Sequence, residues 1–308
     1  MADTPRPLTP LNGFLLGVGA AVVGLIPWVL TGMVLPLQNL WGSATLPEDM
    51  PVALLPFSQY FLMPMFGILV LPGAALGVVL RRGARTRQAA RRSTLAATAG
   101  LVVVQGGAAA QTIAVVAGGL RPGAESFVYL AAISAAILAF LGTSVSVCRE
   151  LASGSVPTAT IAAALGALGA GYWWDAFLSV HPAWMLDLPA ATVRLIFLGG
   201  ALLPAVLTGV ALAWCGWAPR RRLGAWAAAV LVLWVGGAAF QALVASVSSR
   251  ALLGDPQAMV DLAVGGLGRG FVADVPTAAV AVMVGVGGMV APSVSRFYRA
   301  RAGATPRA

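Results

Sequence analysis

Eight long apolar stretches constrain the fold of this chain more than any other feature of its sequence. A helix needs about 20 residues to cross the hydrocarbon core of a bilayer, and each stretch reaches or exceeds that length. The stretches are continuous, whereas barrel strands alternate polar and apolar residues over about 10 positions. They cover residues 12–35, 53–80, 93–118, 126–147, 157–178, 190–216, 224–247 and 271–294. We therefore predict an all-α integral membrane protein with about eight transmembrane helices.

Composition and charge fit this class and predict the orientation. Charged residues make up 9% of the chain, whereas about a quarter of residues are charged in soluble domains. All 19 basic residues are arginine, and they cluster at 81–92, 220–222 and 296–307. With eight spans these clusters share one face, which the positive-inside rule makes cytoplasmic. We expect both termini to be cytoplasmic in a bacterial-type inner or plasma membrane, with the arginines as topology signals and not as ligands of nucleic acid.

Two similar segments suggest an internal duplication. GGAAAQ (106–111) resembles GGAAFQ (236–241), and LPGAALGVVL (71–80) resembles LPAVLTGVAL (203–212). A weaker match relates Ser144-Val145-Ser146 to Ser293-Val294-Ser295, if residues 248–270 form a long outer loop. These matches predict two tandem four-helix repeats with the same orientation, related by an axis along the membrane normal. The predicted parts are an N-terminal tail (1–11), the repeats (12–150 and 151–295) and a basic tail (296–308).

Polar and kink-forming residues inside the spans give the first candidate sites. Gln111 and Gln241 need partners in a bilayer, either as ties between helices or as the lining of a polar route along the seam between the repeats. Pro72 and Pro204 occupy matching positions and are candidate hinges, although kinks are also common in membrane helices. The glycines of GGAAAQ, like those of Gly13-x-x-x-Gly17, are expected to form packing faces.

Three charged residues lie near predicted span ends, where a charge is costly to bury. Asp175, Arg194 and Asp274 either form ties between helices or build an outward-facing polar site together with His181 and Trp174. The tryptophan also suits an interfacial aromatic belt, and a lone histidine without a second ligand does not predict a metal site.

The motifs of membrane-embedded catalysis are missing from this sequence, and so are a phosphate loop and a cluster of metal ligands. We therefore expect no enzyme activity, cofactor or metal. The leading hypothesis is secondary transport or permeation of a small or amphipathic solute, whose identity the sequence does not give. The alternative is a non-catalytic membrane subunit or scaffold. The expected partners are the lipid bilayer and, under the alternative, another membrane protein or further copies of this chain.

Overall fold

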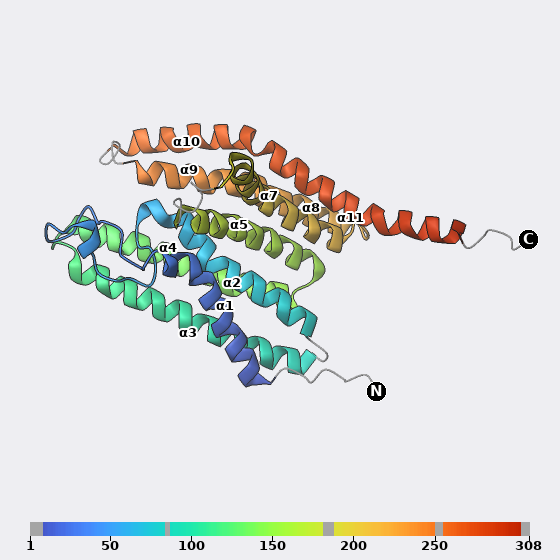
Figure 1. Ribbon diagram of the computed structural model, residues 1–308, viewed down its shortest axis with the longest axis horizontal. Helices are drawn as coiled ribbons and strands as arrows, with labels where there is room; N and C mark the ends of the chain where they lie inside the picture. Colours follow the sequence, from blue (N-terminus) through green and yellow to red (C-terminus); the bar gives the residue numbers. More distant parts are fainter. Residues whose placement is uncertain (1–8, 84–86, 181–187, 250–254, 303–308) are drawn as a thin grey trace, which may run out of the picture.

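A computed structural model describes residues 9–83, 87–180, 188–249 and 255–302. Within these ranges the chain is a bundle of long helices with two isolated β-bridges and no strand (Figure 1). A π-helical turn, Val232–Gly236, joins two of the helices. The helices are α1 (Pro10–Leu30), α2 (Leu62–Gly83), α3 (Arg87–Gly119), α4 (Ala124–Ser153), α5 (Val156–Val180), α7 (Ala190–Cys215), α8 (Arg221–Leu231), α9 (Gly237–Ser248), α10 (Pro256–Ala273) and α11 (Val275–Ala302).

The lengths and hydropathy of these helices confirm a multi-pass membrane fold. In the described ranges seven helices are long and apolar enough to cross a membrane, or up to eight if the bent pair α10–α11 counts as one span. α8 and α9 count as a single span, because the π-helical turn continues the helix between them. Five predicted stretches, those beginning at residues 93, 126, 157, 190 and 224, match helices whose ends differ by a few residues.

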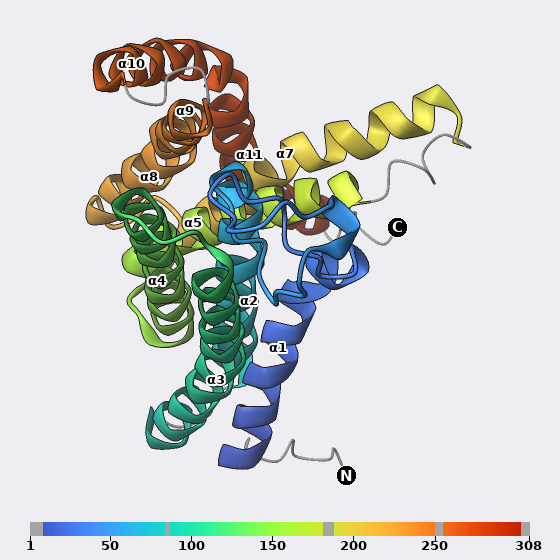
Figure 2. The same cartoon turned by 90° about the vertical axis from the view of Figure 1, so that its left-hand side faces the viewer.

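α5 lies in the middle of the bundle, as Figure 2 shows. It packs against α1, α2 and α4, and it also packs against α7 and α8. The other large contacts join α1 with α3, α2 with α4, α7 with α11, and α9 with α10. The start of α1 and the end of α11 lie at the same end of the bundle (Figure 1). α2 and α5 are the most buried spans, so the centre of the molecule is formed by one helix from each predicted repeat.

The first correction concerns residues 31–58, which form a long connection packed onto the other end of the bundle. We call that end the capped end; it lies at the left of Figure 1. α1 stops at Leu30, because Gly32 takes a left-handed φ of +81° that ends helices. α2 begins at Leu62, after a 3-10 turn, and not at residue 53 as predicted. Pro56 gives the physical reason, because a proline lacks an N–H and disfavours helix in the residue before it.

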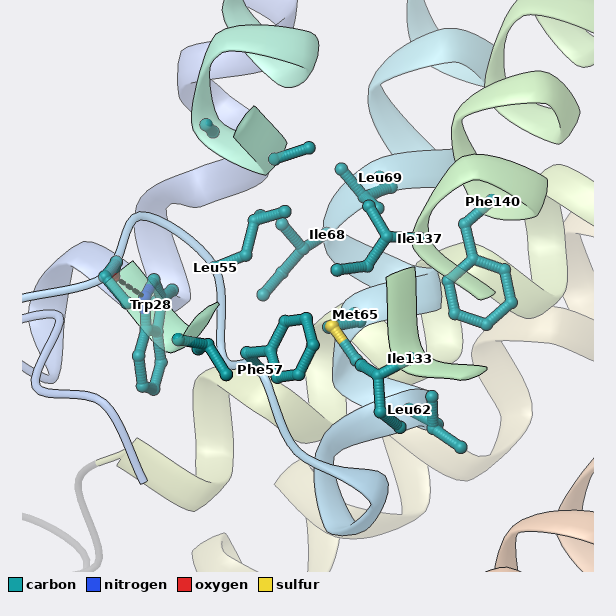
Figure 3. Packing of buried hydrophobic residues seen from close by; sticks show 14 of the residues in the cluster. Trp28, Leu55, Phe57, Leu62, Met65, Ile68, Leu69, Ile133, Ile137 and Phe140 are labelled. Atoms are coloured by element: carbon teal, nitrogen blue, oxygen red, sulfur yellow. Dashed lines mark hydrogen bonds between the residues drawn. The ribbon is translucent and has the colours of Figure 1, made fainter. Parts of the chain in front are cut away.

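The long connection is buried as deeply as a core element. Leu55 and Phe57 are fully buried, and Figure 3 shows them in one cluster with Met65 and Ile68 of α2. Their backbone cannot join a helix, so its polar groups need other partners. α3 supplies two of these, because the Gln111 Oε1 accepts from the Leu54 N–H and the Thr112 Oγ1 accepts from the Leu55 N–H, each at 2.9 Å.

Replacing Thr112 with valine tests this anchoring. The nearly isosteric change removes the acceptor of a buried N–H, so we expect the free energy of unfolding to fall by about 1–3 kcal/mol. Detergent-induced or thermal unfolding of the purified protein would measure the change. Thr143→Val is the matched control, because the exposed Thr143 hydroxyl donates only to a carbonyl of its own helix, that of Ala139. Equal stability of the two variants would contradict the anchoring role.

The second correction concerns residues 248–270, which were predicted to form a loop. Most of them form α10, which begins at Pro256 and is capped by Asp255, whose carboxylate accepts from the Ala258 N–H at 3.0 Å. The charged residues and glycines of α10 hid it in the hydropathy pattern. α10 and α11 meet at an angle of 40°. Asp274, predicted near the start of the last span, lies instead at the bend between these two helices.

Glycine packing is also partly different from the prediction. Within the described part of the chain, a Cβ at Gly106 or Gly107 would meet no atom of a neighbouring element within 4 Å, so the expectation that these glycines form a packing face is wrong. Gly13 and Gly17 do form one, because a Cβ at Gly13 would lie 2.8 Å from the carbonyl oxygen of Ser93. A Cβ at Gly17 would overlap the backbone of Ala97 in α3.

Candidate functional site

A cavity of about 370 Å³ opens at the capped end between α1, α2, α5 and the long connection. Its walls are mainly apolar, and four of the residues are prolines, whose fixed φ makes the walls rigid. The lining residues are Pro27, Trp28, Thr31, Val34, Pro36, Pro56, Phe61, Pro64, Ile68 and Ala176. The volume falls in the range of about 300–1,000 Å³ that is usual for small-molecule sites.

The polar groups of this pocket already have partners within the protein. The Trp28 indole N–H donates to the carbonyl of Ala53 at 2.7 Å, and the Thr31 hydroxyl donates to the carbonyl of Trp28 at 2.6 Å. The lining contains no charged side chain. The pocket can therefore bind an apolar or aromatic group, whereas it offers no ionic contact to a charged group.

Two prolines inside helices, Pro27 in the pocket wall and Pro72 one turn after Ile68, each leave a carbonyl that a side chain from another helix binds. A proline opens the preceding turn, and a carbonyl there can accept a hydrogen bond from elsewhere. Three residues before Pro27, the carbonyl of Gly24 accepts from the Trp173 indole N–H of α5 at 2.9 Å. Three residues before Pro72, the carbonyl of Leu69 accepts from the buried Gln105 amide of α3 at 2.8 Å. The sequence reasoning missed Gln105, although Pro72 signalled a carbonyl in need of a donor.

The candidate hinges Pro72 and Pro204 lie within continuous helices and share one type of contact. A Cβ on Gly24 of α1 would overlap the Pro72 ring. Likewise, a Cβ on Gly171 of α5 would lie 2.6 Å from the Cγ atom of Pro204. Each proline ring therefore fits against a glycine of the neighbouring helix.

The two candidate seam glutamines have different surroundings. The side chain of Gln111 binds the long connection through the Leu54 N–H and also donates to the carbonyl of Val52 at 3.0 Å. Gln241 is an exposed residue of α9 whose side chain lies beside the hydroxyl of Tyr172. Neither glutamine lines the pocket. The structure therefore does not join them in one polar route.

Aromatic rings fill the space between the two predicted repeats. Phe66 of α2, Phe140 of α4, Tyr172 of α5 and Phe240 of α9 form one cluster, with ring centroids 5.3–6.0 Å apart. Edge-to-face pairs predominate, a favourable geometry for aromatic rings. The sequence reasoning missed this cluster, because its members come from four helices with no common motif.

The predicted charged site is only partly assembled. Asp175 and Asp274 both lie close enough to the Tyr172 hydroxyl to act on it electrostatically. Arg194 is an exposed residue of α7, and among the described residues it forms no ion pair with either aspartate. The Trp174 indole lies against Gly200 of α7. His181 lies outside the described residues.

Among the residues that the structure describes, no three His, Cys, Asp or Glu side chains are grouped so that they could hold a metal ion. No protein-family model, curated protein or solved structure matches this chain. Any function must therefore be argued from the geometry of the site itself.

Proposed function

We propose that this protein is a transporter or permease for a small or amphipathic solute, and that the apolar part of the solute enters the proline-lined pocket at the capped end. The observation that carries the proposal is the position of the pocket between α1 and α2 on one side and α5 on the other, which combines helices of both predicted repeats. A site between two such units is where alternating-access transporters bind their substrates.

The contacts next to the pocket suggest which helices would move. Gly24 of α1 packs on the Pro72 ring, and the indole of Trp173 holds the carbonyl of Gly24. A passage past this level requires Trp173 to release the carbonyl of Gly24, and so α5 to move away from α1 and α2. Ile68 lines the pocket and its carbonyl also faces Gly24, so the pocket and the Gly24–Pro72 contact are adjacent.

The packing also supports the proposed duplication, in a register that differs in part from the sequence matches. In the first predicted repeat, α1 packs on α2 and α2 packs on α4. In the second, α5 packs on α7 and α7 packs on α11 in an equivalent way. The contacts are Gly24–Pro72 and Gly77–Cys148 in the first predicted repeat and Gly171–Pro204 and Gly209–Ala281 in the second. The offset is 132 for α2 and α7, as in the proline segments, and 133 for α4 and α11. This register pairs Ser144 with Thr277 and not with Ser293.

Topology and location remain part of the proposal. We place the capped end outside the cell and the ends of α1 and α11 at the cytoplasmic face of a bacterial-type inner membrane, because the arginine clusters lie near the ends opposite the cap. No catalytic reaction or cofactor is included, since the sequence contains none of the motifs that would supply one.

A scaffold or non-transporting subunit is the second candidate, and the aromatic cluster favours it. Phe66, Phe140, Tyr172 and Phe240 fill the seam on the side of α2 and α5 that faces α4 and α9. A seam packed in this way suits a static body that binds a membrane protein partner or further copies of this chain.

Gentle purification followed by mass spectrometry distinguishes the two candidates. We expect an amphipathic molecule to remain bound to the native protein and its amount to fall about tenfold or more in Ala176→Trp, because the added ring occupies the pocket at an overpacking cost of about 1–3 kcal/mol. The molecule found would then be tested for flux in reconstituted vesicles. Val210→Trp, at an exposed position of α7, is the control. Copurification of another membrane protein, with no pocket-dependent molecule, would favour the scaffold.

A further inference from the structure

The bend between α10 and α11 places a carboxylate at a break in a membrane-spanning segment. The Asp274 N–H donates to the carbonyl of Gly270 at 2.9 Å and so closes α10, while the Asp274 carbonyl accepts from the Ala278 N–H at 3.1 Å at the start of α11. α10 and α11 meet the hydropathy criterion of a span together. Pro276 has no N–H with which to continue the hydrogen-bond ladder, so Asp274 lies where the span is interrupted, as ion-binding residues do in transporters with discontinuous helices.

In the described part of the chain, the side chain of Asp274 has no partner that would neutralise it. The residue is half-buried, and among the described residues its carboxylate forms neither a hydrogen bond nor an ion pair. In particular it does not cap α11 and does not reach Arg269 of α10 or Arg194 of α7. A bare carboxylate in apolar surroundings is costly. Its charge therefore favours the uptake of a cation.

A second polar group lies beside this carboxylate. Tyr172 is 8% exposed, and its hydroxyl makes no hydrogen bond of ordinary geometry. The Gln241 side chain lies next to this hydroxyl, and Asp274 and Asp175 both act on it electrostatically. Buried hydroxyls rarely lack a partner, and each case calls for a reason such as an absent ion or water. Phenol, amide and carboxylate oxygens together are the ligands that a hard cation prefers.

We propose that the bend between α10 and α11 binds an exchangeable monovalent cation, a proton or Na⁺, at Asp274, with Tyr172 and Gln241 as neighbouring ligands. The site is separate from the proline-lined pocket, since the pocket lining contains none of these residues. A role of the cation in driving transport rests on the proposed function, whereas cation binding can be measured with no solute present.

Two measurements on the purified full-length protein in nanodiscs test the site and separate the two cations. Infrared difference spectra between acidic and alkaline buffer report the C=O stretch of a protonated carboxylic acid. Thermal unfolding in NaCl against choline chloride at equal ionic strength reports stabilisation by Na⁺. If the cation is a proton, Asp274→Asn removes a carboxyl band. If the cation is Na⁺, the same variant removes the Na⁺-dependent stabilisation.

Conservative variants test cation binding without disturbing the packing of the protein. Tyr172→Phe keeps the ring in its aromatic cluster and removes one oxygen, so the apparent cation affinity should fall about tenfold. Asp261→Asn is the matched control, because this exposed carboxylate of α10 accepts from the Gln257 amide and lies away from the bend. A native protein with neither an Asp274-dependent carboxyl band nor a Na⁺-dependent stabilisation would overturn the site. Loss of solute flux with cation binding intact would overturn only the transport proposal.

Discussion

Replacing Gly17 with valine is expected to separate α1 from α3 and to lower the free energy of unfolding by about 3 kcal/mol, near the upper end of the usual cost of overpacking. A Cβ at this position would overlap the carbonyl of Ala97 and lie 2.8 Å from the backbone nitrogen of Leu101. Backbone atoms within a helix cannot move aside as the end of a flexible side chain can, so the helices themselves must shift. Unfolding in a detergent series, followed by tryptophan fluorescence, would measure the loss.

Gly19 provides the matched control for this substitution. It lies in the same helix, and a Cβ there would meet nothing within 4 Å. Gly19→Val therefore makes the same chemical change on the open face of α1 and should alter stability little. Similar losses in the two variants would show that valine disturbs α1 itself, and the close approach of α1 to α3 would lose its support.

Replacing Phe240 with alanine is expected to cost about 3–5 kcal/mol, the usual range for removing a packed phenylalanine. Phe240 contacts the rings of Phe66, Phe140 and Tyr172 at centroid distances of 5.3, 5.9 and 5.7 Å. These rings come from α2, α4 and α5, so the cavity would open between the two predicted repeats. Thermal unfolding in nanodiscs would measure the loss, and cysteine pairs across α2 and α9 would show whether the seam loosens.

Leu243 is the control for Phe240, because it lies in the same helix and is 54% exposed. Its replacement by alanine removes apolar surface that lipid can cover, so little stability should be lost. An equally small effect of Phe240→Ala would mean that lipid or neighbouring side chains fill the space of the ring. The aromatic cluster would then not be what holds the two halves together.

The helices could be predicted from the sequence because their signal is local. Stretches such as 126–147 and 157–178 are apolar throughout, and a bilayer allows only helices for isolated segments of that kind. The hydropathy signal gave wrong helix boundaries where a segment is apolar because tertiary contacts bury it. Residues 53–57 are apolar because they pack in the core at the capped end, and Pro56 disfavours a helix there. α10 was missed for the opposite reason, since it is helical without being uniformly apolar.

The candidate sites were harder to predict, because they depend on which faces of the helices meet. The GGAAAQ and GGAAFQ match needs an offset of 130 residues. The packing instead makes Leu101 equivalent to Leu233, because Leu101 packs against Ala21 of α1 and Leu233 packs against Leu168 of α5. Those leucines differ by 132 positions. A shift of two residues turns a helix by about 200°, so Gln111 and Gln241 face different neighbours despite their similar surroundings in the sequence.

The hydrogen bonds of the long connection also determine which helices can move relative to one another. Its backbone is tied to the α3–α4 turn by the bonds from Gly42 to Gly119 and from Arg121 to Leu40, at 2.8 and 2.9 Å. With the Trp28 indole bound to Ala53, these ties brace α1 to α4 into a single frame. α5 contributes one wall of the pocket through Ala176 and lies outside that frame. The volume of the pocket then changes when α5 moves relative to the rigid unit formed by α1 to α4.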